Sequence, residues 1–325
     1  MKSELSFEFH PFDTNKLTSI FPIREGEVRI GQRVKTNSND PSVKYVILGI
    51  SESIGPQSNL GRSGSENGFY SFIGRFLSMQ SNQYLDGSEI CVAGEIRQNI
   101  KFKSEKLGCD FVQELDSLLI HILGDILLEN QRLIVIGGGH NNAYPIIAHY
   151  AISKRINVIN LDPHADCRKT DKRHSGNSFS YAIEFGHIEK YHVIGLHKAY
   201  NNQFILDFLK ENHCHFSFLD DYILNRELLL QDISSLAASM DKEFKLGIEL
   251  DMDSIALMPS SAFTPSGISM EEARFYVKTF ASLPQACYLH LPEAAPNNQY
   301  EEMITGKALA FLVYDFIITN LQSQP

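Results

Sequence analysis

Short apolar runs alternate along the chain with longer segments whose apolar residues recur every three or four positions. The short runs are typical of buried strands, and the longer periodicity is typical of amphipathic helices. The expected strands lie at residues 43–50, 133–136, 156–161, 191–196, 213–218, 244–250 and 286–291. The expected helices lie at residues 66–80, 109–130, 144–154, 179–185, 202–212, 270–280 and 300–321.

The order of these elements predicts the fold class. Strands that alternate with helices along a whole chain favour βαβ units, which build a mostly parallel sheet covered by helices on both faces. The sequence therefore predicts a three-layer α/β/α fold. Because it contains no internal repeat and no convincing linker, we expect a single domain over residues 1–325. Residues 1–42 have a mixed pattern, and we expect them to form an N-terminal extension that packs on this domain.

Charged and polar residues stand directly after one of the buried strands. Asp162, His164 and Asp166 are spaced two apart behind the run at 156–161, so on an extended backbone their side chains leave the same face. Buried charge without a partner is costly, and a divalent cation would satisfy these groups. The alternative is a polar surface loop.

Two further strand ends carry similar residues. His140 follows three glycines after the run at 133–136, and Asp251 and Asp253 follow the run at 244–250. A lone histidine in that place is often structural, but three strand ends together supply two histidines and four aspartates. Such an oxygen-rich set suits Mn²⁺ better than structural Zn²⁺. Six ligands exceed what one cation needs, so we expect some carboxylates to bridge two metal ions.

Composition narrows the class of protein. The formal net charge of −10 argues against non-specific nucleic-acid binding. No apolar stretch reaches 18 residues, and the first residues lack the pattern of a signal peptide, so we expect neither a membrane span nor secretion. Five scattered cysteines without a C-x-x-C motif fit a reduced, cytoplasmic protein and not a disulfide framework.

Two loops are candidates for ligand contacts. The Gly-, Ser- and Asn-rich segment 51–64 follows a strand, where α/β proteins place such contacts, although it could also be a flexible surface connection. The segment 168–174 holds four basic residues and one acid in an otherwise acidic chain. It fits an anion-binding wall beside the metal ligands, or alternatively a solvated loop.

The motifs Gly138-Gly139-His140, Asp162-x-His164-x-Asp166 and Asp251-x-Asp253, in this order, resemble those of the ureohydrolase (arginase) family. The resemblance extends from about residue 43 to the C-terminus. It implies an eight-stranded parallel sheet, a centre of two manganese ions, and a trimer or hexamer. It also implies two ligand sets, with Asp162 and Asp251 shared: His140, Asp162, Asp166 and Asp251 for one ion, and Asp162, His164, Asp251 and Asp253 for the other.

The resemblance further implies a reaction. Two such ions activate a water molecule for attack on the planar carbon of an amidine or guanidinium group. Asp166 would take or relay the proton, and Glu293 resembles the family's glutamate that pairs with the substrate's charged nitrogens. Two departures are visible: Ala294-Ala295 follows Glu293 where the family often has Val-Asn or Leu-Asn, and a third aspartate before Pro259 is missing.

The residues around the expected substrate resemble those of formimidoylglutamases, which split N-formimidoyl-L-glutamate into glutamate and formamide. Arginases have asparagine where Arg168 stands and histidine where Phe179 stands, and segment 197–202 lacks the acid that holds their substrate's ammonium group. The expected substrate-binding residues are Arg168, Ser175, Asn177, Tyr200 and Asn201.

Three alternatives stay open at this point. A guanidino hydrolase (agmatinase, guanidinobutyrase or arginase) would release urea instead of formamide. A deacetylase-like enzyme of the same broad fold would use one zinc ion. A non-enzymatic scaffold would tolerate loss of Asp253.

Overall fold

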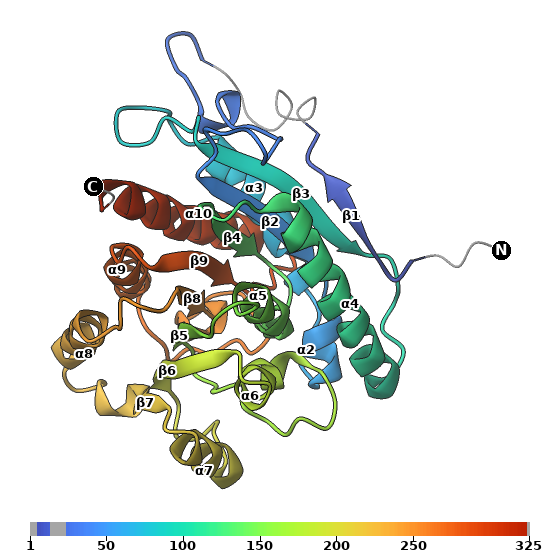
Figure 1. Cartoon of the computed structure of the whole chain (residues 1–325), viewed down its shortest axis with the longest axis vertical. Helices are drawn as coiled ribbons and strands as arrows, with labels where there is room; N and C mark the ends of the chain where they lie inside the picture. Colours follow the sequence, from blue (N-terminus) through green and yellow to red (C-terminus); the bar gives the residue numbers. More distant parts are fainter. Residues whose placement is uncertain (1–4, 14–23, 324–325) are drawn as a thin grey trace.

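A nine-stranded sheet forms the centre of the computed structural model, which describes residues 5–13 and 24–323 (Figure 1). Its strands are β1 (Phe7–Pro11), β2 (Tyr45–Ser51), β3 (Ile90–Gln98), β4 (Arg132–Ile136), β5 (Ile156–Leu161), β6 (Ile188–Leu196), β7 (His215–Phe218), β8 (Leu246–Leu250) and β9 (Ala286–Leu291). They lie in the order β1-β3-β2-β4-β9-β8-β5-β6-β7. All neighbours are parallel except β1, which runs antiparallel to β3.

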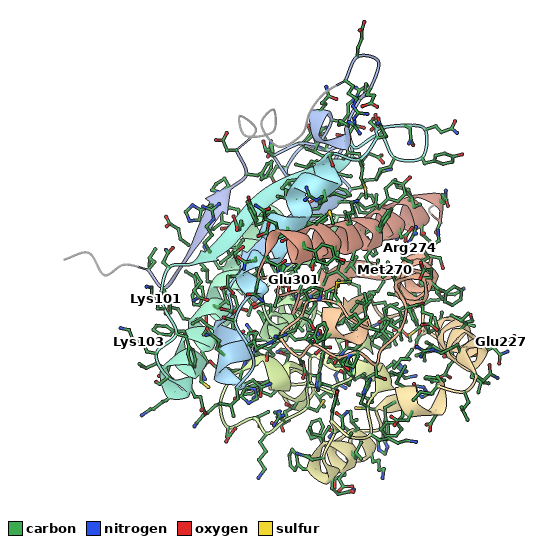
Figure 2. The ribbon with its side chains drawn as sticks, turned by 180° about the vertical axis from the view of Figure 1, so that it is seen from behind. Lys101, Lys103, Glu227, Met270, Arg274 and Glu301 are labelled. Atoms are coloured by element: carbon green, nitrogen blue, oxygen red, sulfur yellow. The ribbon has the colours of Figure 1, made fainter. Side chains whose placement is uncertain are left out.

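Helices cover both faces of this sheet. They are α2 (Ile54–Ser58), α3 (Gly68–Leu77), α4 (Glu105–Ile126), α5 (Ala143–Tyr150), α6 (Ser178–Glu184), α7 (Gln203–Glu211), α8 (Arg226–Ala238), α9 (Met270–Ala281) and α10 (Gln299–Gln322). One apolar core joins the sheet to α3, α8, α9 and α10, and a second joins its other face to α4, α5, α6 and α7. Figure 2 shows the first face, with Met270 and Arg274 on α9 and Glu301 on α10. The expected three-layer α/β fold is confirmed.

The central strands explain why the apolar runs are so continuous. Every residue of β5, β8 and β9 is buried, as expected for parallel strands covered on both faces. Within these strands Glu249 and His290 are charged or polar residues without any exposure. Such groups need partners inside the protein, because burial without a hydrogen bond is costly.

The sequence pattern missed several elements. It did not predict β1, β3, the short helix α2 or α8. Strand β3 contains Gly94 with φ of 153°, which interrupts the pattern, and β1 is a short edge strand of mixed character. In the described part of the N-terminal extension, β1 pairs with β3 and Lys35 bridges to Cys91, so these segments pack on the sheet. That the whole chain forms one domain stays a prediction.

Helix α10 is long and apolar enough to cross a membrane by length and composition. Of its apolar window, 61% is buried inside the protein, with a mean hydropathy of 1.4. Ala308, Leu309, Leu312 and Val313 belong to the core that includes α3 and α9. This burial is what a core helix of a globular protein shows.

Candidate metal centre

The loops behind β4, β5 and β8 meet at the carboxyl edge of the sheet. After β4 the chain turns through Gly137 and Gly138, whose φ angles are 88° and 70°, into the short 3-10 helix η4 (His140–Asn142). A Cβ atom on Gly137 would lie 2.8 Å from the Ile50 carbonyl oxygen, so only glycine fits there. This turn aims His140 across the sheet toward the ends of β5 and β8.

A first group of ligand atoms surrounds one nitrogen of His140. Its Nδ1 lies 3.2 Å from Asp162 Oδ2, 3.1 Å from Asp166 Oδ2 and 3.0 Å from Asp251 Oδ2. A single ring nitrogen can donate at most one hydrogen bond, yet it faces three carboxylates. A divalent cation among these four groups would bind all of them at once.

A second group lies beside the first and shares one residue with it. His164 Nδ1 lies 3.6 Å from Asp162 Oδ1 and 3.3 Å from Asp253 Oδ2. Asp162 thus presents one oxygen to each group. Its Oδ1 also accepts the backbone N–H of His164 at 2.7 Å, and Asp251 Oδ1 accepts that of Asp253 at 2.9 Å. These local bonds fix Asp162 and Asp251, the two carboxylates that the family resemblance implies as bridging ligands.

The charges of this cluster perturb one another strongly. Burial and the neighbouring Asp162 charge raise the pKa of Asp166 to about 6. Burial alone would raise the pKa of Asp162 too, but hydrogen bonds from His140 and His164 lower it to about 2. Burial followed by the Asp251 charge raises the pKa of Asp253 well above its ordinary value. Protons and cations therefore compete for the same carboxylate oxygen atoms of this site.

The residues present fit a pair of divalent cations. Asp253 Oδ1 and Glu293 Oε2 are buried and have no hydrogen-bond partner in the described part of the chain. Asp253 belongs to the second ligand group, and together the two groups form an oxygen-rich donor set that suits Mn²⁺. Glu293 belongs to neither group but lines the cavity beside them.

Glu293 lies next to the first group in an unusual backbone conformation. Its φ is 66°, a region that non-glycine residues rarely occupy, and its Oε1 accepts the backbone N–H of His140 at 2.7 Å. Burial and the charge of Asp251 raise its pKa to about 8. Its side chain lines the same cavity as Asp166, so the two residues predicted to be catalytic face one space.

That space is a cavity of about 330 Å³, and its lining includes three acids of the metal centre, Asp166, Asp251 and Asp253. The walls include four of the five predicted substrate-binding residues: Arg168, Ser175, Tyr200 and Asn201. They also include five residues of the loop at 51–64: Pro56, Asn59, Leu60, Gly61 and Arg62. Sequence reasoning expected this loop to carry ligand contacts but did not name Arg62, its single basic residue.

Asn177, the fifth predicted substrate-binding residue, is buried and does not line the cavity. Its amide nitrogen donates to the carbonyl oxygens of Lys169 and Lys172, and its Oδ1 accepts from Arg173 Nη1 at 2.9 Å. These bonds use both polar side-chain atoms of Asn177 to hold the basic loop in shape. A direct contact between Asn177 and a substrate stays a prediction.

Tyr200 and Asn201 border the cavity in different ways. The Tyr200 ring stacks on His164 at 5.3 Å between centroids and on His197 at 4.8 Å. The Asn201 side chain accepts the backbone N–H of Ala165 and donates to Pro163 O at 2.9 Å. Asn201 therefore holds the turn that carries His164, whereas Tyr200 lines the cavity and packs its ring on two histidines.

Comparisons with known proteins agree with this geometry. A model of the arginase family matches residues 46–319. Curated formimidoylglutamases of Staphylococcus aureus, among them that of strain Newman, are 27% identical over 204 residues, which is 59% of this chain and 62% of the relative. The chain thus spans about three fifths of the length of the curated relatives it matches.

Solved structures with a similar fold cover nearly the whole chain. Formiminoglutamase of Trypanosoma cruzi with Mn²⁺ aligns with a TM-score of 0.73 and 19% identity, over 92% of this chain and 100% of that one. Formimidoylglutamase of Bacillus subtilis aligns with a TM-score of 0.75 and 17% identity, over 94% of this chain and 95% of that one. Proclavaminate amidino hydrolase of Streptomyces clavuligerus aligns with a TM-score of 0.73 and 16% identity, over 93% of this chain and 99% of that one.

Proposed function

The chain belongs to the arginase family of metallohydrolases, and from this premise we propose that it hydrolyses N-formimidoyl-L-glutamate to L-glutamate and formamide. Two Mn²⁺ ions would be held by the two ligand groups that share Asp162. When bound, such a pair of ions activates water and neutralises developing negative charge.

The observation that carries the substrate proposal is a pair of guanidinium groups in the cavity wall. Arg62 and Arg168 both line the cavity, and no carboxylate of the described residues forms an ion pair with either. Arg62 Nη2 donates to the Ser260 carbonyl oxygen at 2.9 Å, which fixes its position and leaves its other N–H groups for a ligand. An arginine can bind a carboxylate through two parallel hydrogen bonds.

Formimidoylglutamate matches this distribution of charge. It carries both a cationic amidine and two carboxylates, and the cavity is lined both by acids of the metal centre and by two arginines. Arginine offers one carboxylate beside an ammonium group, and agmatine offers an ammonium group alone. Because like charges repel in a confined site, the two arginines disfavour agmatine and favour a dicarboxylate.

Two acids that line the cavity, Asp166 and Glu293, are suited to the other parts of the reaction. Glu293 Oε2, which has no partner in the described structure, can accept an N–H of the amidine. Asp166 lines the same cavity, and a carboxylate in this place can take a proton from the attacking water and return it to the leaving nitrogen. The bond that breaks joins the formimidoyl carbon to the glutamate nitrogen, and this nitrogen leaves with the proton.

The decisive experiment measures products on a panel of formimidoylglutamate, arginine, agmatine and guanidinobutyrate with Mn²⁺ present. We expect formamide from the first compound and little urea from the others. Arg168→Lys and Arg62→Lys should each lower kcat/KM by about ten- to a hundredfold, because a charged hydrogen bond typically contributes about 1.5–3 kcal/mol. Lys172→Ala is the matched control, since this residue belongs to the same loop but does not line the cavity.

Faster release of urea from arginine or agmatine would replace this proposal by a guanidino hydrolase. Unchanged kcat/KM in both lysine variants would remove the arginines as carboxylate anchors. Loss of activity in Lys172→Ala to the same extent would show that the whole loop, not the cavity-lining side chains, is responsible.

A further inference from the structure

Behind the first ligand group lies a buried carboxylate, Glu249, which the reaction above does not use. It stands in β8 opposite His290 of β9 in the sheet register, and neither residue has any exposed surface. Both lie on the side of His140 that faces away from the three aspartates of the first group.

The contacts of Glu249 join three side chains. Its Oε2 accepts a hydrogen bond from His290 Nδ1 at 2.6 Å and lies 3.4 Å from His140 Nε2. Its Oε1 accepts the Tyr288 hydroxyl at 2.8 Å. Both oxygens are therefore engaged, and the shared oxygen stands between the two histidines.

The protonation state of His140 follows from what each ring nitrogen faces. Nδ1 faces three aspartate oxygens at 3.0–3.2 Å, so as a ligand it must present its lone pair to a cation. The neutral ring then carries its proton on Nε2. Nε2 is buried and has no hydrogen-bond partner in the described part of the chain, and the acceptor it faces is Glu249 Oε2 at 3.4 Å, which is within reach of a hydrogen bond.

We propose that Glu249 is a positioning residue for the metal centre: it accepts the Nε2–H of His140 and so fixes the ring orientation and the tautomer that present Nδ1 to the first ion. A carboxylate in this place also makes the ligand nitrogen more basic than a neutral acceptor would. His290 and Tyr288 hold Glu249 in turn. The same assignment excludes a third cation between His140, Glu249 and His290, although their ligand atoms lie close together, because Nε2 has no free lone pair.

Mn²⁺ affinity of the full chain tests this without reference to activity. Titrations followed by electron paramagnetic resonance should resolve two ions in the parent protein. In Glu249→Gln one ion should bind about 10- to 100-fold more weakly, the usual effect of losing such a partner, with a smaller change for the other. A circular dichroism spectrum and a Tm of the metal-free variant that match those of the parent show that weaker Mn²⁺ binding does not come from misfolding. Should the variant not fold, Glu249→Asp, which withdraws the carboxylate from His140, should weaken the same ion.

A double-mutant cycle distinguishes positioning from general structural damage. In a His140→Ala background, Glu249→Gln should cause no further loss of Mn²⁺ affinity, because its effect passes through that ring. Tyr288→Phe is the matched control: it removes the bond to Oε1 but leaves Oε2 between the histidines, so its effect on affinity should be much smaller.

Parent-like affinity in Glu249→Gln, equal weakening of both ions, or additive losses in the cycle would overturn the assignment. The inference rests on the metal centre and not on the substrate. If the product panel yields urea while Glu249→Gln still weakens one ion, the proposed substrate fails and the inference about Glu249 stands.

Discussion

Glu293 shows how one residue is held in a strained conformation by its surroundings. Its φ of 66° costs energy for a residue with a Cβ atom, on the order of 1–3 kcal/mol. Its backbone N–H donates to Gly138 O at 2.8 Å, and its carbonyl oxygen accepts from Ser261 N at 3.1 Å. These bonds hold the backbone so that the carboxylate lines the cavity, where Oε2 has no hydrogen-bond partner among the described residues.

At this residue we predict that Glu293→Gln lowers kcat by about ten- to a hundredfold, because an amide holds the amidine cation less well than a carboxylate. The glutamine oxygen can still accept the His140 N–H, so bound Mn²⁺ should remain at the parent level. Steady-state kinetics and elemental analysis check both parts. Full turnover in the variant would exclude contact between Glu293 and the substrate's charged nitrogens.

At the scale of elements, the loop between β5 and α6 depends on a buried ion pair. Arg173 donates from Nε to Asp116 Oδ2 of α4 at 2.8 Å and from Nη2 to Asn141 O at 2.8 Å. Its guanidinium lies between the rings of Tyr144 and Tyr181. The pair thus ties α4, the loop and the turn of His140 together, and Arg173 is a structural residue of the basic segment.

We predict that Asp116→Ala lowers the free energy of unfolding by about 3–5 kcal/mol, because Arg173 would be left buried without its counter-charge. Denaturant titration measures this change. Glu243→Ala, which breaks an exposed ion pair with Lys154, serves as control and should leave stability nearly unchanged. A small effect of Asp116→Ala would mean that Asn177 and the tyrosines suffice to hold Arg173. The folded fraction of Asp116→Ala should also show a higher KM, because the loop between β5 and α6 that Arg173 holds also carries Arg168.

At the scale of the whole molecule, several buried acids and two histidines gather at the carboxyl edge of the sheet. Carboxylates raise the pKa values of His140 and His164 well above the ordinary value, against the effect of burial. Burial raises the pKa of Glu293 to about 8. Without metal ions, the folded protein therefore holds protons at neutral pH that the unfolded chain releases.

The sign of the pH dependence follows from these raised values. A group whose folded pKa exceeds its unfolded pKa stabilises the protein at low pH, and this contribution is lost as pH rises through the folded value. Burial lowers the pKa of His174 and His192 to about 4, so these two groups make the folded protein more stable as pH rises. That gain occurs between about pH 4 and pH 7 and adds nothing at higher pH. Between about pH 7 and 8.5 the loss of bound protons should dominate.

We therefore predict that the Tm of the metal-free protein falls from pH 7 to pH 8.5, and that Mn²⁺ raises Tm more at the higher pH. Metal ions then replace the protons, and ligand binding to the folded state stabilises it. Calorimetry with and without chelator at the two pH values checks this. A metal-free Tm that rises over this range would show that other groups control stability.

The sequence by itself determined the fold class and the sets of candidate ligands. Apolar runs alternating with amphipathic segments specify a covered parallel sheet, because both periodicities follow from backbone geometry alone. The spacing of Asp162, His164 and Asp166 at a strand end is equally local. The hydrophobic pattern of the sequence missed β1, β3 and α8, because an edge position, a glycine or a sparse apolar face weakens the periodicity there.

Only the tertiary structure decided which residues of similar chemistry do different things. Arg168 and Arg173 stand in one basic segment, yet the first lines the cavity and the second is buried against Asp116, which lies 57 positions away. Glu249 lies two residues before Asp251, just as Asp251 lies two residues before Asp253, yet Glu249 faces His140 and His290. Those contacts exist because β9 lies between β4 and β8 in the sheet, and strand order depends on long-range packing that no local pattern records.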